Sequence, residues 1–350
     1  MLNLRIVRGP LLDAEEKVIL EEYNRLTGAQ ISLDQFKHWV RDSPEGPSWH
    51  AILETDDSKI VGHFSIIPLR AEHEGEKLIA AKSEYFFVNE LYRREKVRGF
   101  EKSYLTCAIL LPSKLFESCH SLGWGPFLTS VSEEIQPFYK ALGCRPANFE
   151  LSECLLILRP LEAARRTPNL TKWQRMALFL VGAAQRLIWP VANMFLRESP
   201  VVRFTSASSV CLHPQKDRIA FFQDSTSVTW RYPDEEYVTL TSATDSNQYL
   251  IAKHGSNDRY LRVCQWHIEG KKNRFAFLLA LINQAKQQKA LGVRWSLYSD
   301  AEQSDMLSSL RKLGFLCVHR DRKLFLYTNK DIFLKPEAWS ITDSFFCLDL

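Results

Sequence analysis

The sequence predicts an α/β protein with two tandem domains, each built on a mixed, mostly antiparallel sheet, joined by a helical linker. The chain has 350 residues, which is more than one ordinary domain holds. Runs of β-branched and aromatic residues alternate with segments of helical periodicity in both halves. The segment 140–144 is also similar to the segment 311–315, which indicates that one pattern occurs twice.

In the first half, two helices precede an antiparallel meander. Asp13 and Ser32 are expected to begin the helices, which Gly28 and Pro44 end. The predicted order is strand, helix, helix, three strands, helix, strand, helix, strand, at residues 4–12, 13–28, 32–43, 49–54, 60–67, 80–88, 100–121, 127–131, 133–142 and 151–158. A strand–helix–strand unit needs a parallel crossover, so the sheet is expected to be mixed.

The end of this order recurs in the second half. Two strands are expected at residues 249–252 and 260–266, followed by a long helix at 274–290. A strand after Gly292, a helix that ends at Gly314 and a last strand at 323–327 then follow. This self-similarity predicts duplication of one domain type. The expected boundaries are residues 1–159 for the first domain, 160–200 for the helical linker and 201–350 for the second domain.

Composition narrows the classes of function. The formal net charge of +4 is small for this length and argues against a nucleic-acid partner, while leaving room for a local anion site. The eight cysteines are scattered without metal-ligand spacing, so we expect unpaired, buried thiols in a reducing compartment and no metal. The N-terminus has no run of signal-peptide type, which predicts a cytoplasmic protein.

The linker contains an unusually apolar helix, expected from Thr171 to about residue 197. Its polar positions recur every eleven residues and form one narrow stripe: Gln174, Arg175, Gln185, Arg186 and Arg197. These polar residues make a bilayer span unfavourable. Two alternatives remain, a helix buried between the domains and kinked at Pro190, or a helix in a membrane interface. The nearly all-round apolar character favours the first.

A family resemblance lies in two motifs of the first half. Residues 84–94, with the basic loop and long helix that follow, resemble the acyl-CoA-binding motif of GNAT N-acyltransferases, in which a strand ending in Val leads into Tyr-Arg and a glycine-rich loop. Residues 138–144 are similar to the family's Phe-Tyr-x-x-Leu-Gly-Phe helix ending. The resemblance covers most of residues 1–158. It implies a GNAT fold, acetyl-CoA or another acyl-CoA as co-substrate, and a small-molecule amine as acceptor.

The basic loop is the candidate site for the CoA pyrophosphate. A helix N-terminus offers backbone N–H groups and a positive dipole end to phosphates, and the loop adds cationic side chains. By resemblance, the cofactor-binding candidates are Phe87, Val88, Arg93, Arg94, Lys96, Arg98 and Gly99. The family loop has two glycines where this chain has only Gly99. Either arginine and lysine side chains replace the glycine backbone, or CoA binding is weak or lost.

Acyl transfer to an amine needs a base for the ammonium proton and an acid for the leaving thiolate. By resemblance, Tyr139 is the acid, with packing on an amphipathic helix as the alternative role. Glu84 is the base candidate, with a place on the sheet surface as the alternative. His50 and His63 lie on neighbouring predicted strands and could face either side of the sheet.

The second half has a leucine, Leu310, where Tyr139 stands in the first, so this domain is expected to be degenerate. Residues 229–233 and 339–344 resemble tandem GNAT-like proteins of bacterial surface-polysaccharide biosynthesis, which favours an amino sugar or a similar precursor as acceptor. Two other functions remain open: a catalytically silent GNAT-like scaffold, and a FemAB-like aminoacyl transferase that uses charged tRNA. The interfacial alternative for the linker helix would add a peripheral membrane location. The oligomeric state is not fixed by the sequence.

Overall fold

The computed structural model describes residues 1–340 except 104, 131–132, 167–170, 195–201, 211–217, 222–223, 234–236, 256–258 and 299–300. Its contacts divide the chain into two compact units. The first unit takes its described residues from Met1–Asn148, Pro214–Gln223 and Lys323–Trp339, and the second from Phe149–His213, Asp224–Arg322 and Ser340. Each half of the sequence therefore supplies residues to both units.

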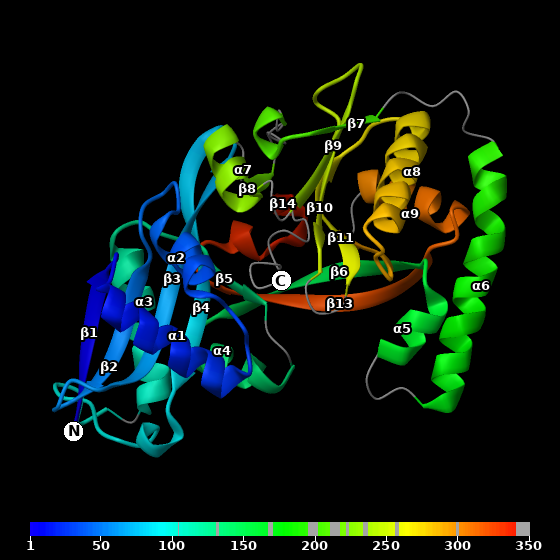
Figure 1. The fold of residues 1–350 in the computed structure, drawn as a ribbon. Coiled ribbons are helices and arrows are strands. Elements are labelled where there is room, and N and C mark those ends of the chain that lie inside the picture. The colour runs from blue at the N-terminus through cyan, green and yellow to red at the C-terminus, as the bar shows by residue number, and fades with distance from the viewer. Residues whose placement is uncertain are drawn as a thin grey trace. The chain divides into compact units, whose positions relative to one another are not determined.

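The first unit is built on a mixed sheet (Figure 1). Its strands, in spatial order, are β1 (Leu2–Arg8), β2 (Trp49–Thr55), β3 (Ile60–His73), β4 (Glu76–Val88), β5 (Phe127–Ser130) and the end of β13 (Leu316–Tyr327). Strands β1 to β4 are antiparallel, β4 and β5 are parallel, and β5 and β13 are antiparallel. The short β8 (Ile219–Phe221) pairs with β3 and with β14 (Trp339–Ser340).

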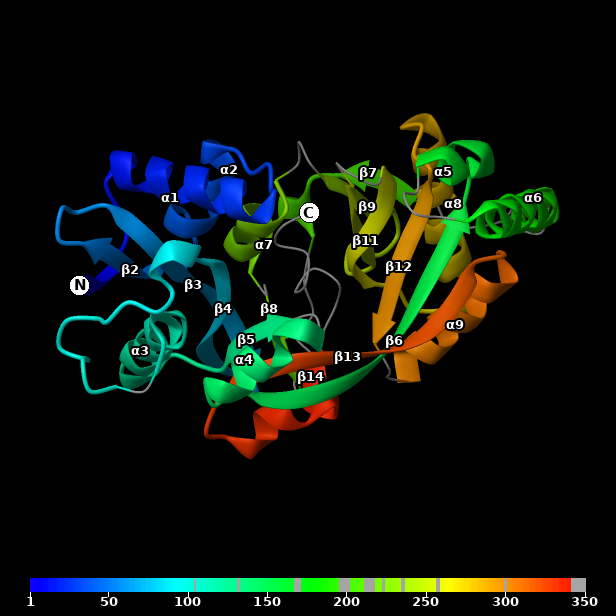
Figure 2. The same ribbon diagram turned by 90° about the horizontal axis from the view of Figure 1, so that it is seen from below.

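Helices cover both faces of this sheet (Figure 2). They are α1 (Asp13–Thr27), α2 (Leu33–Arg41), α3 (Cys107–Ser121) and α4 (Gln136–Ala141). Ser32 caps α2 by accepting a hydrogen bond from the Gln35 amide, and Gly28 ends α1 in the left-handed conformation, as the sequence predicts. The core of this unit packs α3 and α4 against the sheet around Phe64, Phe116 and Phe127.

The second unit repeats the same strand order. Its sheet runs β7 (Val202–Thr205), β9 (Tyr237–Ser242), β10 (Tyr249–His254), β11 (Tyr260–His267), β12 (Gly292–Tyr298) and β6 (Arg145–Ile157). The first four strands are antiparallel, β11 and β12 are parallel, and β12 and β6 are antiparallel. The same order of strand orientations in both units agrees with the predicted fold class of two tandem mixed α/β domains.

The last strand of each sheet comes from the other half of the sequence. The strand expected at residues 151–158 exists, but it pairs with β12 in the second unit, from Leu151↔Tyr298 to Ile157↔Gly292. The strand expected at 323–327 also exists and pairs with β5 in the first unit, from Leu324↔Ser130 to Tyr327↔Phe127. Gly292 permits the first pairing, because a Cβ there would lie 2.0 Å from the Leu156 carbonyl oxygen.

The remaining elements are short or lie in the second unit. The helices are α5 (Pro160–Arg166), α6 (Lys172–Met194), α7 (Ser225–Arg231), α8 (Lys271–Gln287) and α9 (Ala301–Lys312), with 3-10 turns η1 (Glu90–Tyr92), η2 (Glu133–Ile135), η3 (Ala207–Ser209), η4 (Asp331–Leu334) and η5 (Pro336–Ala338). Helices α8 and α9 pack on β12, and the core of the unit surrounds Phe277 and Trp295. The sequence did not predict β7, β8, β9 or α7.

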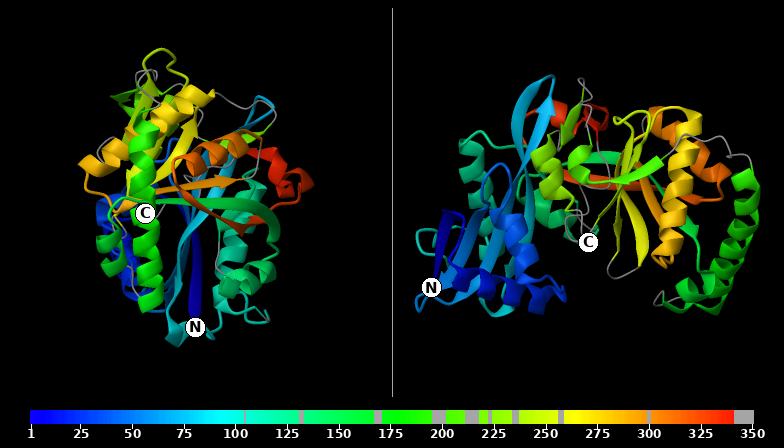
Figure 3. Two further views of the ribbon diagram at one scale, coloured as in Figure 1. Left: turned by 90° about the vertical axis from the view of Figure 1, so that its right-hand side faces the viewer. Right: turned by 45° about the horizontal axis from the view of Figure 1, so that its top comes forward.

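The linker helix differs from the expectation that it is buried between domains. Figure 3 shows α6, in green, beside α5 at the edge of the second unit. Among its described side chains only Gly182 and Gln185 are buried, while Trp173 is 77% exposed and Leu180 60% exposed. The helix is continuous through Pro190, and the side chains from Arg186 onward, with Arg197, lie outside the described residues. No helix in the described part of the chain is long and apolar enough to cross a membrane.

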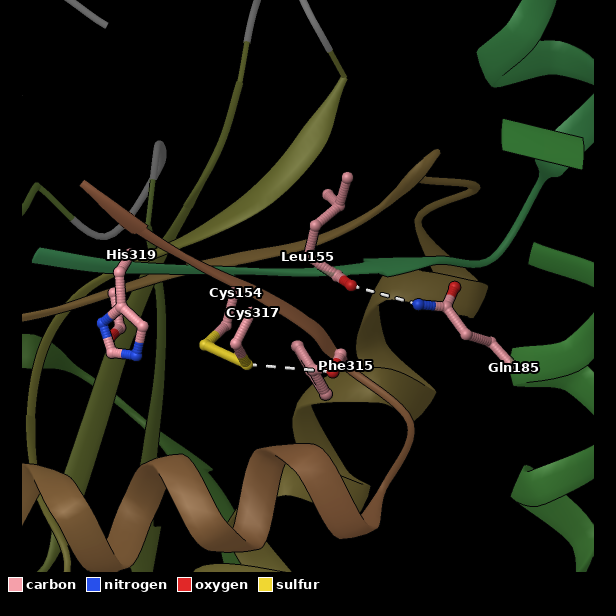
Figure 4. Close-up of a disulfide and its surroundings, with 7 residues drawn as sticks. Cys154, Leu155, Gln185, Phe315, Cys317 and His319 are labelled. Carbon is pink, nitrogen blue, oxygen red and sulfur yellow. Dashed lines mark hydrogen bonds between the residues drawn. A yellow bond between two sulfur atoms is a disulfide. The ribbon is translucent and has the colours of Figure 1, made fainter. Parts of the chain in front are cut away.

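The cysteines were expected to be unpaired, and for two of them this is wrong. Cys154 on β6 and Cys317 on β13 form a disulfide within the second unit, across a sequence separation of 163 residues (Figure 4). Cys107, Cys119 and Cys144 are buried free thiols, as expected, and Cys264 is also buried. Burial raises the pKa of both Cys119 and Cys144 to about 12, so these thiols are not activated nucleophiles. Cys211 and Cys347 lie outside the described residues.

Candidate active site

The candidate site forms where β4 separates from β5 in the first unit. In the described residues these parallel strands pair only at Ala81↔Phe127 and Lys82↔Leu128. Beyond that point β4 continues to Val88, paired with β3 alone on its other side. The candidate residues Ser83 and Glu84 follow directly after this last pair.

A β-bulge at Tyr85 changes the direction of β4 at the same place. The register with β3 shifts between His63 and Ser65, and Tyr85 adopts a left-handed φ of 53°. Such a φ costs free energy for a bulky residue unless its surroundings hold it. The Tyr85 ring is buried against Tyr23 and Phe36, at centroid distances of 5.3 and 4.7 Å. Packing therefore fixes the bulge from the α1 and α2 side.

Two buried histidines hold the backbone of the bulge. His63 Nδ1 lies 2.9 Å from the Tyr85 carbonyl oxygen, and His50 Nδ1 lies 3.0 Å from His63 Nε2. Because a carbonyl only accepts, His63 carries its proton on Nδ1 and its Nε2 accepts from His50. Burial is the main cause that lowers the pKa of His63 to about 4 and the pKa of His50 well below its usual value, so both rings are neutral. The pair thus positions the bulge and carries no charge at neutral pH.

The hydroxyl of Tyr139 on α4 lies near the place where β4 separates from β5. Tyr139 is buried, 7% exposed, and its ring packs near Phe325 of β13 at 6.3 Å between centroids. Burial raises the pKa of Tyr139, the neighbouring Thr129 and Ser83 hydroxyls oppose the rise, and the negative charge of Glu84 adds to it. The phenol therefore stays protonated at neutral pH, as a general acid must.

Glu84 lies on the same stretch of β4, and its negative charge acts on the Tyr139 phenol. It forms a nearly buried ion pair with Lys82, two residues earlier on the same face of the strand. Its backbone carbonyl also accepts a hydrogen bond from Ser65 Oγ at 3.0 Å. The acid candidate Tyr139 and the base candidate Glu84 thus both lie along this stretch of β4, Tyr139 beside Ser83 and Glu84 paired with Lys82.

The basic loop is folded onto β1 and uses most of its own amides. The Arg98 amide donates to the Leu2 carbonyl at 2.8 Å, and the Leu2 amide donates to the Lys96 carbonyl at 2.9 Å. Further amides donate within the loop: those of Arg93, Glu95, Gly99, Phe100 and Ser103. Helix α3 also begins at Cys107, several residues later than expected. Most backbone N–H groups of the loop that could bind phosphates are therefore already hydrogen-bonded within the loop or to β1.

The side chains of the cofactor-binding candidates divide into two groups. Phe87 and Val88 are buried, so only their backbone can meet a ligand. The exposed group is cationic: Arg93 lies 3.6 Å from Glu90, Arg98 lies 2.9 Å from Asp56, and Lys96 Nζ donates to the Ser103 carbonyl at 3.4 Å. Arg94 is also exposed. Gly99 has a φ of 81° with open space around it.

The second unit lacks the corresponding hydroxyl. Leu310, the counterpart of Tyr139, is fully buried in the core, and Trp266 and Trp295 pack edge to face at 5.6 Å beside β11 and β12. The start of α8 is more open than that of α3. Gly270 precedes the helix with a φ of 77° and open space around it, and Lys271 and Lys272 are exposed. This unit retains a helix N-terminus suited to an anion but no acid beside it.

Sequence reasoning missed three residues of the site and left the role of the two histidines open. Ser83 and Thr129 contribute hydroxyls near Tyr139, Lys82 pairs with Glu84, and the His50–His63 pair supports the bulge. The alternation of side chains along β4 places Lys82 and Glu84 on one face, which was a usable signal. No metal-binding cluster of histidine, cysteine or carboxylates occurs in the described residues.

The comparisons with known proteins bear on the fold. No protein-family model matches the sequence, and no curated protein is similar to it in sequence. A solved structure from Enterococcus faecalis, described as a probable N-acyltransferase, has a TM-score of 0.58 at 9% identity over 92% of this chain and 72% of its own. A GCN5-related N-acetyltransferase from Kribbella flavida has a TM-score of 0.55 at 13% identity, over 92% and 71%.

A third structure has the same domain arrangement along the chain. It is a tandem GNAT protein from the clavulanic acid biosynthesis pathway, with a TM-score of 0.52 at 13% identity over 93% of this chain and 98% of its own. The chain therefore has the tandem GNAT fold. The first unit contains the candidate residues Tyr139 and Glu84, and the second has Leu310 at the position that corresponds to Tyr139.

Proposed function

We propose that this protein is an acyl-CoA-dependent N-acyltransferase whose active site lies in the first unit. One observation carries the proposal: a buried, protonated phenol and a carboxylate whose charge acts on it both lie where β4 separates from β5. The structural neighbours named as N-acyltransferase and N-acetyltransferase have the same fold and support this class of reaction. No residue of the site requires a metal for the chemistry described below.

The proposed reaction is direct transfer from the thioester to an amine. Glu84 accepts a proton from the ammonium group, and the neutral amine attacks the thioester carbonyl carbon. A carbon–nitrogen bond forms, the carbon–sulfur bond breaks, and the Tyr139 hydroxyl donates its proton to the leaving thiolate. The nitrogen loses its second proton as the amide forms, which restores the Tyr139 phenol, and Glu84 releases its proton to solvent. Lys82 and the histidine pair act by holding Glu84 and the backbone in position.

Side chains are the proposed ligands of the CoA phosphates. Since the loop amides already have partners, Arg94, Lys96 and Arg93 would supply charge-assisted hydrogen bonds in their place. This arrangement fits phosphates, but it depends more on salt than a backbone cradle does. A silent CoA-binding scaffold is the second candidate, and the occupied loop amides are the observation that favours it.

The acceptor that we propose is an amine on a small molecule, with an amino sugar or another surface-polysaccharide precursor as the first class to test. This choice rests on the sequence resemblance of residues 229–233 and 339–344, of which 341–344 lie outside the described residues. Arg231 in the first segment is fully buried and donates to the Tyr237 hydroxyl at 3.3 Å. That segment therefore contributes to the core of the second unit.

A thiol-release assay tests the proposed function. Purified protein, acetyl-CoA and a panel of amines that includes amino sugars should release free CoA thiol in an amine-dependent manner. The Glu84→Gln variant should lower kcat at least about tenfold, since it removes the proposed base. Tight acetyl-CoA binding without amine-dependent thiol release from any amine would instead support the silent scaffold.

A further inference from the structure

Helix α6 has an exposed apolar face that no other described element covers. Its members lie at helical spacings of three and four residues, and we call them the outer face of α6: Trp173, Met176, Phe179 and Leu180. Their exposed fractions are 77%, 48%, 38% and 60%. Four large apolar side chains that are exposed next to one another form a larger apolar patch than the single apolar residues that are normal on protein surfaces.

The opposite side of α6 is anchored to its own unit. Gly182 packs so closely on α5 that a Cβ there would lie 2.6 Å from Pro160 Cβ. The Gln185 side chain bonds strand β6 twice: Nε2 donates to the Leu155 carbonyl at 3.1 Å (Figure 4), and Oε1 accepts from the Ile157 amide at 2.8 Å. The orientation of the helix is therefore fixed, and its outer face points away from these contacts.

The charges around the outer face are positive. Lys172 and Arg175 are exposed and stand seven and four residues before Phe179, along one edge of the face. No acidic residue occurs from Lys172 to Met194. On the neighbouring α5, Glu162 is neutralised by Arg159, Arg166 and Arg259 at 3.1–3.4 Å, while Arg165 is exposed.

We propose that the outer face of α6 docks this protein on an anionic membrane surface. Tryptophan, phenylalanine and leucine beside lysine and arginine are the composition of helices that lie in a lipid interface. The apolar surface continues through Phe179 into an open groove of about 720 Å³ lined by residues 156–162 and Gln185. A second copy fits less well, because two outer faces packed together would bring Lys172 and Arg175 of each copy against like charges.

Vesicle co-flotation of the full chain tests this proposal. Binding is expected to vesicles of equal parts phosphatidylcholine and phosphatidylglycerol, with much weaker binding to phosphatidylcholine alone and release by salt. The variants Arg175→Glu and Leu180→Asp should each lower the partition coefficient at least about tenfold. The matched controls are Lys77→Glu and Leu122→Asp, exposed residues of the first unit that should leave binding unchanged.

Two results would overturn the proposal. One is equal recovery of the wild type with and without anionic vesicles. The other is a concentration-dependent dimer, measured by analytical ultracentrifugation, that Leu180→Asp abolishes, because the outer face would then be covered by another copy. Circular dichroism of each variant confirms that α6 is retained, since Leu180 and Arg175 are exposed and their substitution leaves the contacts of Gly182 and Gln185 in place.

Discussion

Tyr139 combines burial with a functional hydroxyl, and substitution can separate the two. Tyr139→Phe keeps the ring and removes only the group near Thr129 and Ser83. We expect kcat to fall by about a hundredfold or more, the usual contribution of a general acid, with acetyl-CoA affinity nearly unchanged. Steady-state kinetics and calorimetry measure the two quantities. Stability should fall by about 0.5–1.5 kcal/mol for the loss of this buried hydroxyl.

The matched control for this substitution is Tyr249→Phe in the second unit. Tyr249 is also buried and accepts a hydrogen bond from Gln265 Nε2 at 3.3 Å. Removing the Tyr249 hydroxyl should lower the free energy of unfolding by a similar amount and leave kcat unchanged. If Tyr139→Phe behaves like this control, Tyr139 is a packing residue and not the acid.

The histidine pair predicts how stability changes with pH. In the unfolded chain these rings take up protons near pH 6.5, whereas burial lowers the folded pKa of His63 to about 4. The free energy of unfolding is therefore highest above pH 6.5 and falls as pH decreases toward about 4, by about 3 kcal/mol for His63 alone. Urea unfolding across this range measures the slope.

His63→Phe distinguishes this cause from titration elsewhere. The variant cannot bind the Tyr85 carbonyl, so it should be less stable at neutral pH. It also removes a titrating ring, so its stability should depend less on pH. An unchanged pH slope would mean that other groups cause the acid sensitivity.

At the residue scale, sequence reasoning found some of the candidate site but could not show how it is assembled. Tyr139 and Glu84 were chosen by resemblance, and the structure places both where β4 separates from β5, while their roles stay predictions. The facing of His50 and His63 could not be predicted, because the bulge at Tyr85 shifts the register by one residue. Ser83 and Thr129 were missed, since small polar residues on strands carry no pattern of their own.

At the element scale, the sequence predicted which helices exist better than the residues at which they begin and end. Helices α1 and α2 were predicted through their caps, Gly28 and Ser32, which act locally. Helix α3 begins later than expected, because Val97 is buried and the loop pairs with Leu2 instead of continuing the helix. The loop residues therefore do not form the N-terminus of a helix, whose backbone N–H groups bind phosphates in the family's motif.

The packing of α5 on α6 gives a prediction at this scale. A side chain at Gly182 would collide with Pro160 and Ile157, so Gly182→Val should lower the free energy of unfolding by about 1–3 kcal/mol. Urea denaturation measures it. Ala184→Val, an exposed position on the same helix, is the control and should cost less than 1 kcal/mol, about the size of a propensity change. Equal effects would show that α6 does not pack closely on α5.

At the scale of the whole molecule, the fold class was predicted correctly and the pairing of the last strands was not. Both halves contain the expected apolar strands, but nothing in their composition says which sheet they join. The choice depends on side-chain packing between residues far apart in sequence. The Cys154–Cys317 disulfide was unpredictable for the same reason, since 163 residues separate the two cysteines.

The disulfide predicts a redox-dependent stability. Closing a loop of this length restricts the unfolded chain, so reduction should lower the free energy of unfolding by about 2–5 kcal/mol. Thermal unfolding with and without a thiol reductant measures this for the wild type. The Cys317→Ala variant should show no such response. A wild type that is insensitive to reductant would indicate that the bond contributes nothing to stability.

Calorimetric titration with acetyl-CoA tests the central claim, an acyl-CoA site on the first unit. The wild type should bind. Arg94→Ala should weaken binding by about 1–3 kcal/mol, the size of a lost charge-assisted hydrogen bond, and Lys96→Ala should act in the same direction. Lys272→Ala, at the start of α8 in the second unit, should leave the affinity unchanged. Absence of binding, or weakening by Lys272→Ala and not by Arg94→Ala, would contradict the account.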